Sequence, residues 1–467
     1  MDYRLLIDGE LVRGNLALDV INPATGLVFA SAARADAAQL EQAIDAGQRA
    51  FPDWSRRSYV ERSAYLQRFA AGIEVRLEEF AHLLTREQGK PLVRARHEMT
   101  VTIAALRYYA AQDLQPRVLR ASADELVIEQ RHAQGVVAAI SSWNFPVILL
   151  MHKVGAALIS GNCVIAKPAP TTPLTTLLMG MVAASTLPPG VFQTIVDQND
   201  LGTVLSSHPG IAHVSFTGST ATGKKVLNST ADTLKRFSLE LGGNDAAIIL
   251  DDADVKQVAP KIFNSAMLNA GQICFASKRV YVPRAMLDSV CAEFVRLAGE
   301  ARVGDGMDPA TTVGPVQNRA QYERLLGYIA EARTEGTILA GGNAVGGGGY
   351  FIAPTIVRDL PDTARLVREE QFGPVMPVLA YDNEDEMLAR VNNSEYGLGG
   401  TIWTGSAQRG IALAERIETG TVWVNRHMAL HLDVAFGGVK QSGVGQQQGI
   451  AGIEEFTDLR VVSAALN

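Results

Sequence analysis

Three short stretches of the chain carry side chains that could together perform covalent catalysis. Cys274 lies in NAGQICFA, Glu240 lies in FSLELGGN, and Asn144 lies in SSWNFP between two aromatic residues. A thiol, a carboxylate and an amide can serve as nucleophile, general base and oxyanion donor. A lone cysteine is more often inert packing than a nucleophile, so each stretch alone proves little. The fold must bring the three together.

The composition limits the classes of protein that need to be considered. A chain of 467 residues suggests two or three domains, and 47% hydrophobic with 19% charged residues is typical of a globular protein. A net charge of −7 argues against a nucleic-acid or anionic-membrane surface. Three cysteines without a CxxC pattern favour a reducing compartment. Neither a signal peptide nor a membrane span is indicated, so we predict a cytoplasmic protein.

Alternation of strands and helices organises most of the chain. Residues 3–35 contain strand and turn patterns, and residues 36–113 space apolar residues three and four apart, as helices do. Strands and helices alternate over residues 134–250 and again after Cys274. This alternation predicts an α/β fold with two doubly wound parallel-sheet lobes, and we place the seam between them near Gly242.

Two strand patterns have no place in either lobe. One covers residues 124–131, and the other is the tail EEFTDLRVVSAAL, after which no helix follows. We expect the two strands to pair in a small sheet that reaches another subunit. The glycine-rich segment 341–349 reads as a surface loop, because the α/β pattern continues on both sides of it.

The nucleotide-binding signals are individually weak. No G-x-G-x-x-G occurs, and the G-x-x-x-x-G-K of residues 218–224 is followed by Lys225 rather than by Ser or Thr, which argues against a P-loop NTPase. Ser219 follows a predicted strand and precedes a helix, where it suits either a phosphate or a plain helix cap. Lys167 ends another predicted strand, in the ligand crevice of an open sheet or simply in solvent.

Taken in order, these stretches resemble the aldehyde dehydrogenase superfamily over essentially the whole chain. SSWNFP is similar to the family's PWNFP with Ser142 in place of the first Pro, AKPAP to its KPSE, and FTGSTATG to its FTGS turn. LELGGN and GQICFA match the acid and cysteine signatures, with Glu240 and Cys274 spaced as in that family. EEQFGPV, NSEYGLGGTIWT and FGGVKQSGVG match three further motifs.

The resemblance implies an aldehyde dehydrogenase-like fold of three parts. These are an NAD(P)-binding, Rossmann-like domain over residues 1–114 and 134–242, a catalytic domain over 243–445, and a small β oligomerisation element over 115–133 and 446–467. It also implies a homodimer or homotetramer that oxidises an aldehyde to a carboxylic acid with reduction of NAD or NADP.

The family's catalytic roles fall on four residues of this sequence. By resemblance, Cys274 attacks the aldehyde, and Asn144 with the Cys274 backbone N–H holds the oxyanion of the thiohemiacetal. Hydride then passes to the nicotinamide, and Glu240 activates a water that hydrolyses the remaining thioester. Lys153 aligns with a lysine that relays protons from this glutamate. Because acyl transfer to coenzyme A occurs in members without the glutamate, we expect free acid as the product.

The resemblance also assigns the cofactor site. Lys167 is expected at the adenosine ribose, Gly218 and Ser219 at the pyrophosphate, and Glu370 with Phe372 at the nicotinamide riboside. Further contacts are implied for Ser142, Trp143, Leu241, Gln321 and Arg324.

Two departures from the family's motifs bear on the cofactor and on the protons. Pro170 replaces the glutamate of KPSE, which in NAD-preferring members binds the ribose and repels a 2′-phosphate. We therefore predict dual or NADP-leaning cofactor use, although the sequence does not place the second cation that NADP needs. Gln447 replaces a glutamate sometimes assigned to proton relay, so proton exit is expected to depend on Glu240, Lys153 and water.

The resemblance places the aldehyde among largely aromatic residues. The expected lining is Phe145, His152, Ile273, Phe275, Arg426 and Phe436. This lining suits an aromatic, medium-chain or polar-substituted aldehyde, while Arg426 leaves a carboxylate-bearing semialdehyde as the alternative. Leu268 weakens the succinate-semialdehyde reading, because those enzymes carry an arginine there. His427 and His431 lack an evident third ligand, so we predict no metal.

Two other function classes are kept open. A catalytically silent binding member of the fold would be marked by loss of Cys274 or Glu240, and both residues are present. A thioester hydrolase or esterase without redox chemistry would use the same thiol. Reduction of NAD(P) by an aldehyde distinguishes that activity from a dehydrogenase.

Overall fold

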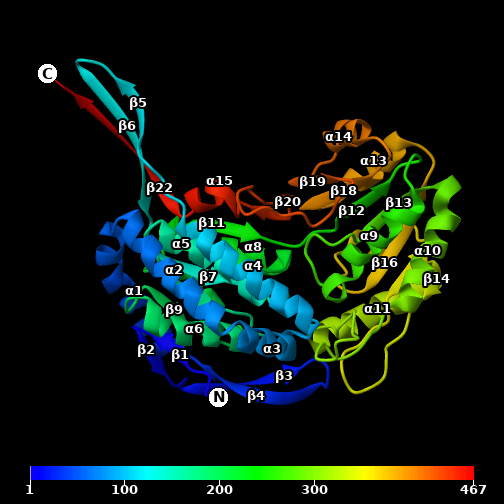
Figure 1. Ribbon diagram of the computed structural model, residues 1–467, viewed down its shortest axis with the longest axis horizontal. Helices are drawn as coiled ribbons and strands as arrows, with labels where there is room; N and C mark the ends of the chain where they lie inside the picture. The colour runs from blue at the N-terminus through cyan, green and yellow to red at the C-terminus, as the bar shows by residue number, and fades with distance from the viewer. Residues whose placement is uncertain (1, 467) are drawn as a thin grey trace.

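The computed structural model describes residues 2–466 as two α/β lobes and a projecting arm (Figure 1). The first lobe is built on an eight-stranded sheet of order β2-β1-β9-β8-β7-β10-β11-β21. Its strands are β1 (Leu5–Ile7), β2 (Glu10–Val12), β7 (Val136–Ile140), β8 (Cys163–Lys167), β9 (Phe192–Thr194), β10 (His213–Thr217), β11 (Arg236–Glu240) and β21 (Gly443–Val444). Its helices are α1 (Ala37–Arg56), α2 (Tyr59–Val75), α3 (Leu77–Gln88), α4 (Leu92–Ala110), α5 (Pro146–Ile159), α6 (Leu174–Thr186), α7 (Gly202–Ser207) and α8 (Thr220–Thr230).

The second lobe is built on a seven-stranded sheet of order β14-β15-β16-β13-β12-β18-β19. Its strands are β12 (Ala246–Ile249), β13 (Arg279–Pro283), β14 (Thr337–Ala340), β15 (Thr355–Arg358), β16 (Val375–Tyr381), β18 (Gly399–Trp403) and β19 (Thr421–Val424). Its helices are α9 (Val255–Met267), α10 (Leu287–Glu300), α11 (Arg319–Glu335), α12 (Arg365–Arg368), α13 (Glu384–Asn392) and α14 (Ala407–Ala414). Two short ribbons complete the lobes: β3 (Leu16–Asn22) with β4 (Leu27–Arg34), and β17 (Tyr396–Gly397) with β20 (Val439–Lys440).

The prediction of two doubly wound lobes is confirmed, with one refinement. The inner strands of both sheets are parallel, but β1, β2, β21 and β14 run antiparallel at the edges. The parallel strands are buried on both faces and read as continuous apolar runs, such as VVAAI in β7. An edge strand needs no crossover helix, so an antiparallel neighbour can be added by a short connection.

The strand order of the first lobe creates a crevice. From β7 the chain passes to β8 and β9 on one side, whereas β10 and β11 lie on the other side. Ligands of open α/β sheets bind where the order reverses, beyond the carboxyl ends of the strands. The helix that follows β7 is positioned by its sequence, because Pro146 occupies the first turn of α5, where a missing N–H costs nothing.

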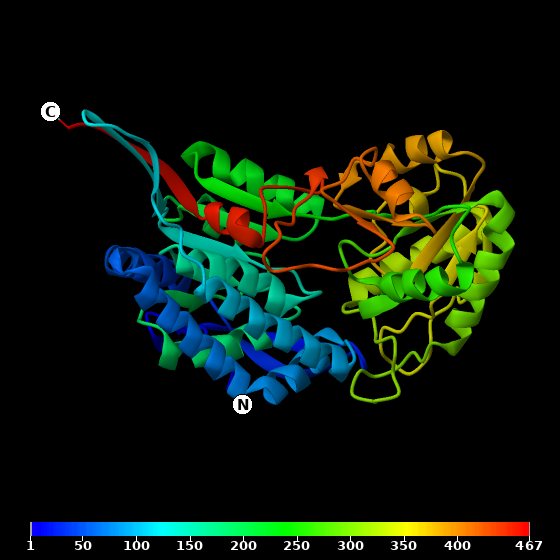
Figure 2. The same cartoon turned by 45° about the horizontal axis from the view of Figure 1, so that its top comes forward.

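The arm projects from the first lobe in both views (Figures 1 and 2). It is the three-stranded sheet of β5 (Arg117–Ala121), β6 (Glu125–Ala133) and β22 (Thr457–Ala465), and β22 follows the short helix α15 (Gly449–Glu454). The predicted pairing of the tail with the earlier strand is confirmed, because β22 pairs with β6 along its whole length. Across residues 2–466, no helix combines the length and apolarity that crossing a bilayer requires.

Candidate active site

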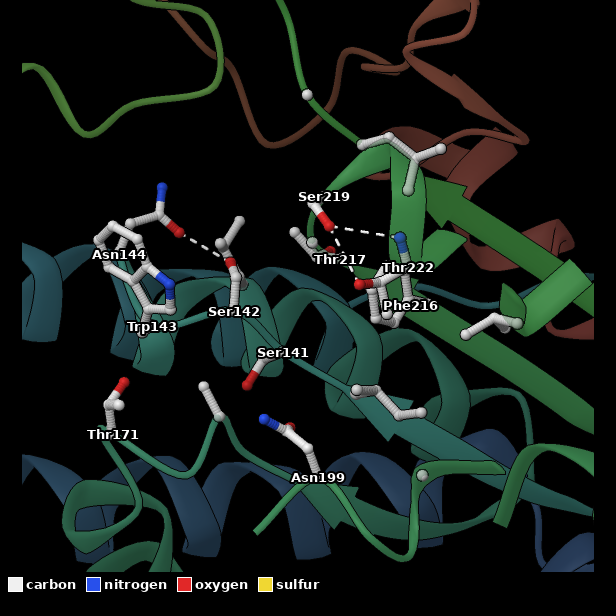
Figure 3. Close-up of a pocket in the computed structure, with 18 of the residues that line it drawn as sticks. Ser141, Ser142, Trp143, Asn144, Thr171, Asn199, Phe216, Thr217, Ser219 and Thr222 are labelled. Atoms are coloured by element: carbon white, nitrogen blue, oxygen red, sulfur yellow. Dashed lines mark hydrogen bonds between the residues drawn. The ribbon is translucent and has the colours of Figure 1, made fainter. Parts of the chain in front are cut away.

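A cleft of about 650 Å³ lies between the lobes, at the carboxyl ends of β7, β8, β10 and β11 (Figure 3). Cys274 and Asn144 both line it, so the fold brings together two of the three stretches singled out in the sequence. Glu240 ends β11 immediately before Leu241 and Gly242, which also line the cleft. The position agrees with the crevice expected from the strand order.

The loop that carries Cys274 has an unusual backbone. Asn269, Ala270 and Gly271 have φ values of 53°, 53° and 71°, all in the left-handed region. A side chain at Gly271 would place its Cβ 2.2 Å from the carbonyl oxygen of Gly373, so only glycine fits. Left-handed residues other than glycine cost of order 1–2 kcal/mol each. Strain of this kind is typical of loops that the surrounding structure holds in one functional conformation.

The Cys274 thiol is poorly disposed to ionise on its own. Burial, together with the negative charges of Glu370, Asp245 and Glu240, raises its pKa to about 12, and burial is the largest of these causes. Lys278 is the neighbour that acts in the opposite direction. The other two cysteines, Cys163 and Cys291, are buried, whereas Cys274 is partly exposed to the cleft.

The Asn144 side chain is oriented from both ends. Its Oδ1 accepts a hydrogen bond of 2.7 Å from the Ser142 hydroxyl, and its Nδ2 donates to the Gln272 carbonyl oxygen at 3.0 Å (Figure 3). A carboxamide nitrogen carries two hydrogens, so one remains for a ligand in the cleft. Asn144 is therefore fixed as a donor and is bonded to Gln272, which lies two residues before Cys274 in the chain, and this arrangement suits an oxyanion hole.

A buried ion pair supports the backbone of Asn144. Lys90 Nζ lies 2.5 Å from Glu98 Oε2 and donates to the Asn144 carbonyl oxygen at 2.9 Å. Glu98 Oε1 accepts hydrogen bonds from the backbone N–H groups of Val147 and Ile148, at the start of α5. A carboxylate is favourable at a helix N-terminus. The pair therefore joins α3–α4 to the loop that presents the amide.

Glu240 and Lys153 alter each other's pKa through their charges, although their side chains form no close ion pair. Burial raises the pKa of Glu240, which the charge of Lys153 opposes, and burial lowers the pKa of Lys153, which Glu240 opposes. Within residues 2–466, the Glu240 carboxylate makes no hydrogen bond, and Lys153 Nζ donates only to the Ser215 hydroxyl, at 3.1 Å. Both groups are thus shifted toward titration near neutral pH, which suits proton transfer.

A line of buried polar groups continues from Ser215. Its hydroxyl oxygen lies 2.9 Å from that of Ser238, which lies 3.2 Å from His213 Nε2. His213 Nδ1 lies 3.0 Å from Gln134 Oε1 at the base of the arm. The line satisfies hydroxyl and imidazole groups that would otherwise be costly to bury.

The residues expected at the phosphates and ribose line the cleft. Ser219 caps α8 by accepting from the Thr222 N–H at 3.3 Å, which leaves other N–H groups of that helix terminus free for a phosphate. Lys167 Nζ lies 2.6 Å from the buried Asp197, which offsets part of its charge. The other expected residues of this lobe, Ser142, Trp143, Gly218 and Leu241, also line the cleft.

Three buried hydroxyls of the cleft support the fit to a dinucleotide. Ser141, Thr171 and Thr217 line the cleft, and their hydroxyl oxygens find no hydrogen-bond partner in the part of the chain that the structure describes. Buried polar groups normally have partners. The hydroxyls and phosphates of NAD(P) would supply them, so these residues fit the cofactor.

The second lobe closes the cleft with the remaining cofactor residues. The Phe372 ring packs edge-on against Trp143 of the first lobe, with centroids 5.3 Å apart. Glu370 Oε1 accepts from the Gly243 N–H at 3.1 Å. Gln321 lines the cleft, but its Nε2 donates to the Gln371 and Phe372 carbonyl oxygens, so it also fixes this loop. Arg324 lies beside these residues in the lining.

Comparison with known proteins assigns the family. The profile of the aldehyde dehydrogenase family matches residues 12–462. The chain belongs to the aldehyde dehydrogenase family. The 2-aminomuconic semialdehyde dehydrogenase of Bos taurus is 34% identical over 98% of this chain and 97% of its own length. The family assignment makes this chain an NAD(P)-dependent enzyme of aldehyde oxidation.

Solved structures of the family agree with the architecture. An aldehyde dehydrogenase of Bacillus cereus, solved as its NAD⁺ complex, has a TM-score of 0.98 and 34% identity, covering 100% of this chain and 97% of that one. An NADP-dependent enzyme of E. coli has a TM-score of 0.97 and 32% identity, with coverage of 100% and 98%. Relatives of both cofactor types are therefore equally similar in fold.

Aromatic side chains lie where the aldehyde is expected to bind. Phe275 packs against Phe436 and Trp423, with ring centroids 5.5 and 5.9 Å apart, and Cys274 contacts this cluster. Phe145 lies against Lys90, whose Nζ is 3.8 Å from the ring centroid. Ile273, next to Cys274, is almost fully buried.

The polar residues expected there are held by neighbours. His152 is buried between the Tyr109 hydroxyl at 3.0 Å and Gln448 Nε2 at 3.2 Å, and burial lowers its pKa to about 3. Arg426 is exposed and lies 2.9 Å from His431 Nε2. His427 lies 3.2 Å from the Ser277 hydroxyl. Among the described residues, no group of three or more His, Cys, Asp or Glu side chains could hold a metal.

Sequence reasoning missed several residues of the site. Lys90 and Glu98 belong to no recognised pattern, yet they contact the Asn144 loop. Lys278 is buried against the backbone of the nucleophile loop. Its place four residues after Cys274 was the only available signal. Ser215 lies in the expected phosphate-turn strand but points to Lys153.

Proposed function

We propose that the chain is a hydrolytic aldehyde dehydrogenase that uses Cys274 as nucleophile and Glu240 as base. The observation that carries the proposal is the shared cleft: Cys274 and the oriented amide of Asn144 line it, and Glu240 ends β11 directly before the lining residues Leu241 and Gly242. The thiol gives its proton to water in the cleft, and its sulfur adds to the aldehyde carbon. The Asn144 amide and the Cys274 N–H hold the resulting oxyanion, and a single such donor contributes about 3–4 kcal/mol.

The nicotinamide cofactor, when bound, accepts the hydride that turns the thiohemiacetal into a thioester. Glu370, Phe372 and Trp143 would hold the nicotinamide end of this cofactor, and the amino terminus of α8 would hold its phosphates. Glu240, deprotonated, then takes a proton from a water that attacks the thioester carbon. The acid leaves, and the thiol of Cys274 is regenerated. Lys153, in its neutral form, accepts the proton from Glu240, and the ammonium that results keeps the regenerated carboxylate ionised for another cycle.

Dual or NADP-leaning cofactor use is part of the proposal. Pro170 lines the cleft beside Thr171, in place of a glutamate that would repel a 2′-phosphate. Lys225 of α8 lines the same cleft, and this position supports Lys225 as the second cation for a 2′-phosphate. Because Asp197 offsets part of the Lys167 charge, we infer tolerance of both cofactors rather than strict NADP dependence.

The substitution Pro170→Glu tests this inference. We expect kcat/KM for NADP to fall at least about 10-fold more than kcat/KM for NAD, equivalent to roughly 1.4 kcal/mol of charge repulsion. Pro170→Gln is the matched uncharged control. Equal losses with both cofactors would show that this position does not set the preference.

The substrate is proposed to be an aromatic or medium-chain aldehyde, with or without polar substituents. The support is the cluster of Phe275, Phe436 and Trp423 beside the nucleophile, because aromatic and apolar groups gain most from such a surface. A carboxylate-bearing semialdehyde is the second candidate. It is favoured by the exposed Arg426, held by His431, and by the name of the Bos taurus relative.

Assembly into dimers or tetramers is proposed through the arm. Leu459, Val461 and Val118 of its sheet are each more than half exposed, and apolar strands left uncovered in this way mark association surfaces. Sedimentation velocity tests this proposal. Wild-type protein should sediment as an oligomer, and Val461→Glu should shift it toward monomer, while a monomeric wild type would contradict it.

A panel of aldehydes, each assayed with NAD and with NADP, tests the function as a whole. Appearance of the reduced cofactor, with one carboxylic acid formed per hydride, is expected for wild type and should be lost in Cys274→Ala. No reduction of either cofactor across aromatic, aliphatic and carboxylate-bearing aldehydes would overturn the proposal. Within the panel, a preference for benzaldehydes over semialdehydes would decide between the two substrate classes.

A further inference from the structure

Lys278 is a buried cation whose charged end lies against the nucleophile loop. Its side chain is 2% exposed. Its Nζ donates to the carbonyl oxygens of Ile273 and Cys274, at 2.6 and 2.5 Å. The catalytic scheme above gives it no role. A buried ammonium is expensive unless its environment uses the charge, so its position calls for an explanation.

The contact with Ile273 acts directly on an oxyanion donor. The Ile273 carbonyl belongs to the same peptide group as the Cys274 N–H. A cation on the carbonyl oxygen draws electron density from that group, so its N–H becomes a stronger donor. The second contact, with the Cys274 carbonyl, fixes the next peptide plane. Together they hold the backbone on both sides of the Cys274 side chain.

Among the charges that act on Cys274 within the described residues, Lys278 is the cation that favours the thiolate. The carboxylates of Glu370, Asp245 and Glu240 all oppose ionisation of Cys274. Arg279 is turned away from the cleft, since its guanidinium donates to backbone carbonyls including that of Asn244. Lys278 also lies 3.6 Å from Glu370 Oε1, at the expected nicotinamide ribose site.

We propose that Lys278 is a positioning residue that strengthens the Cys274 N–H as oxyanion donor, favours the thiolate, and links both to Glu370. The inference rests on the proposed roles of Cys274 and Glu370. With cofactor bound, a ribose whose hydroxyls donate hydrogen bonds to the Glu370 carboxylate weakens the attraction between that carboxylate and Lys278. More of the ammonium charge then acts on the nucleophile loop. Cofactor binding should therefore make Cys274 more reactive.

A structural role alone predicts something different. A lysine that merely satisfies two carbonyl groups would alter stability when replaced, but not the pH at which Cys274 ionises. Three variants separate these effects. Lys278→Arg keeps the charge, Lys278→Gln keeps a hydrogen-bond donor without the charge, and Lys278→Met removes both. Lys261→Met, on the exposed side of α9, is the matched control.

The test measures the rate at which iodoacetamide alkylates Cys274 as a function of pH, with and without NAD, alongside steady-state kinetics. Lys278→Gln and Lys278→Met should move the alkylation profile up by about one pH unit or more. They should also lower kcat about 10-fold or more, short of the 10²–10³ lost with a whole oxyanion donor. KM for the aldehyde should change less. Lys278→Arg should recover most of the reactivity, and Lys261→Met should match wild type.

The inference is overturned if Lys278→Gln folds and keeps the wild-type alkylation profile and kcat. Should Lys278→Met fail to fold, Lys278→Gln decides the matter. Loss of the NAD-dependent rise in alkylation in Lys278→Gln, but not in Lys278→Arg, supports the link to Glu370, and its persistence in both overturns that link. Failure of the proposed function is recognised separately, because the wild-type protein would then reduce neither cofactor with any aldehyde, or Cys274→Ala would keep the wild-type rate.

Discussion

Two buried lysines, Lys90 and Lys153, differ in whether a carboxylate contacts them directly. Lys90 is held 2.5 Å from Glu98 and also binds the Asn144 carbonyl oxygen. Lys153 faces Glu240, but within residues 2–466 it makes no ion pair within 4 Å and donates only to Ser215. Burial lowers the pKa of both lysines. Only the first has a carboxylate in direct contact that holds it charged.

This difference in contacts separates a pair that stabilises the fold from a pair that is placed to exchange protons. The Lys90–Glu98 pair is closed: its members also bind the backbone at Asn144, Val147 and Ile148, so a change of protonation would break several contacts at once. The Lys153–Glu240 pair is open, in the sense that its two side chains form no direct ion pair. Because its members interact through space, each can gain or lose a proton without dismantling the fold, and the two titrate together.

The largest effect should come from the base of the open pair. Glu240→Gln cannot accept a proton from water, so steady-state turnover should fall about 10²–10⁴-fold. Acylation and hydride transfer do not need this base, so a burst of about one reduced cofactor per site should remain. Rapid-mixing kinetics measure both. The exposed Glu74→Gln is the control, and full steady-state turnover in Glu240→Gln would remove Glu240 from the mechanism.

Breaking the closed pair should cost stability rather than chemistry. Glu98→Gln leaves Lys90 as an uncompensated buried charge, which should reduce the free energy of unfolding of the first lobe by about 3–5 kcal/mol. The midpoint of urea unfolding, followed by circular dichroism, measures the loss. The double variant Lys90→Met with Glu98→Leu should lose less, because no buried charge remains. A stable Glu98→Gln would show that the pair is dispensable.

The surroundings of the two lysine pairs also show which contacts can be predicted from a sequence and which cannot. The motifs around Cys274, Asn144 and Glu240 predicted the cleft residues, because short-range patterns such as a strand end or a glycine turn are encoded locally. The contact of Lys90 with Asn144 joins residues 54 positions apart and follows from packing of helices, which no local pattern records. The contacts of Lys278 could not be predicted either, because a lysine near the start of a strand usually points to solvent.

The edges of the sheets show the same limit. The parallel inner strands were predictable from apolar runs, but β21 is two residues long and joins the first sheet from the far end of the chain. Pairing of that kind depends on the three-dimensional path of the second lobe. The Asp197 partner of Lys167 lies on a loop thirty residues away in sequence and likewise carries no local signal.

Removing the cation of the open pair should shift its pH dependence. The Lys153 charge holds down the pKa of Glu240, so Lys153→Met should raise that pKa. Because the base works deprotonated, the acidic limb of the pH profile of thioester hydrolysis should move up by about one unit or more. Turnover near neutral pH should then fall about 10-fold. Lys224→Met on the exposed face of α8 is the control, and an unmoved limb would separate Lys153 from Glu240.

The smallest effect should come from the hydroxyl next to Lys153. Ser215 accepts a hydrogen bond from the ammonium, so Ser215→Ala disfavours the charged lysine. With less average charge beside it, Glu240 should titrate at higher pH, moving the acidic limb in the same direction as Lys153→Met but by less than about one unit. Ser238→Ala removes the next hydroxyl of the line without touching Lys153. A shift in Ser215→Ala alone indicates a local effect on the lysine. Equal shifts in both variants would show that the buried line from Lys153 to His213 acts as one unit, and the open pair would then extend to the base of the arm.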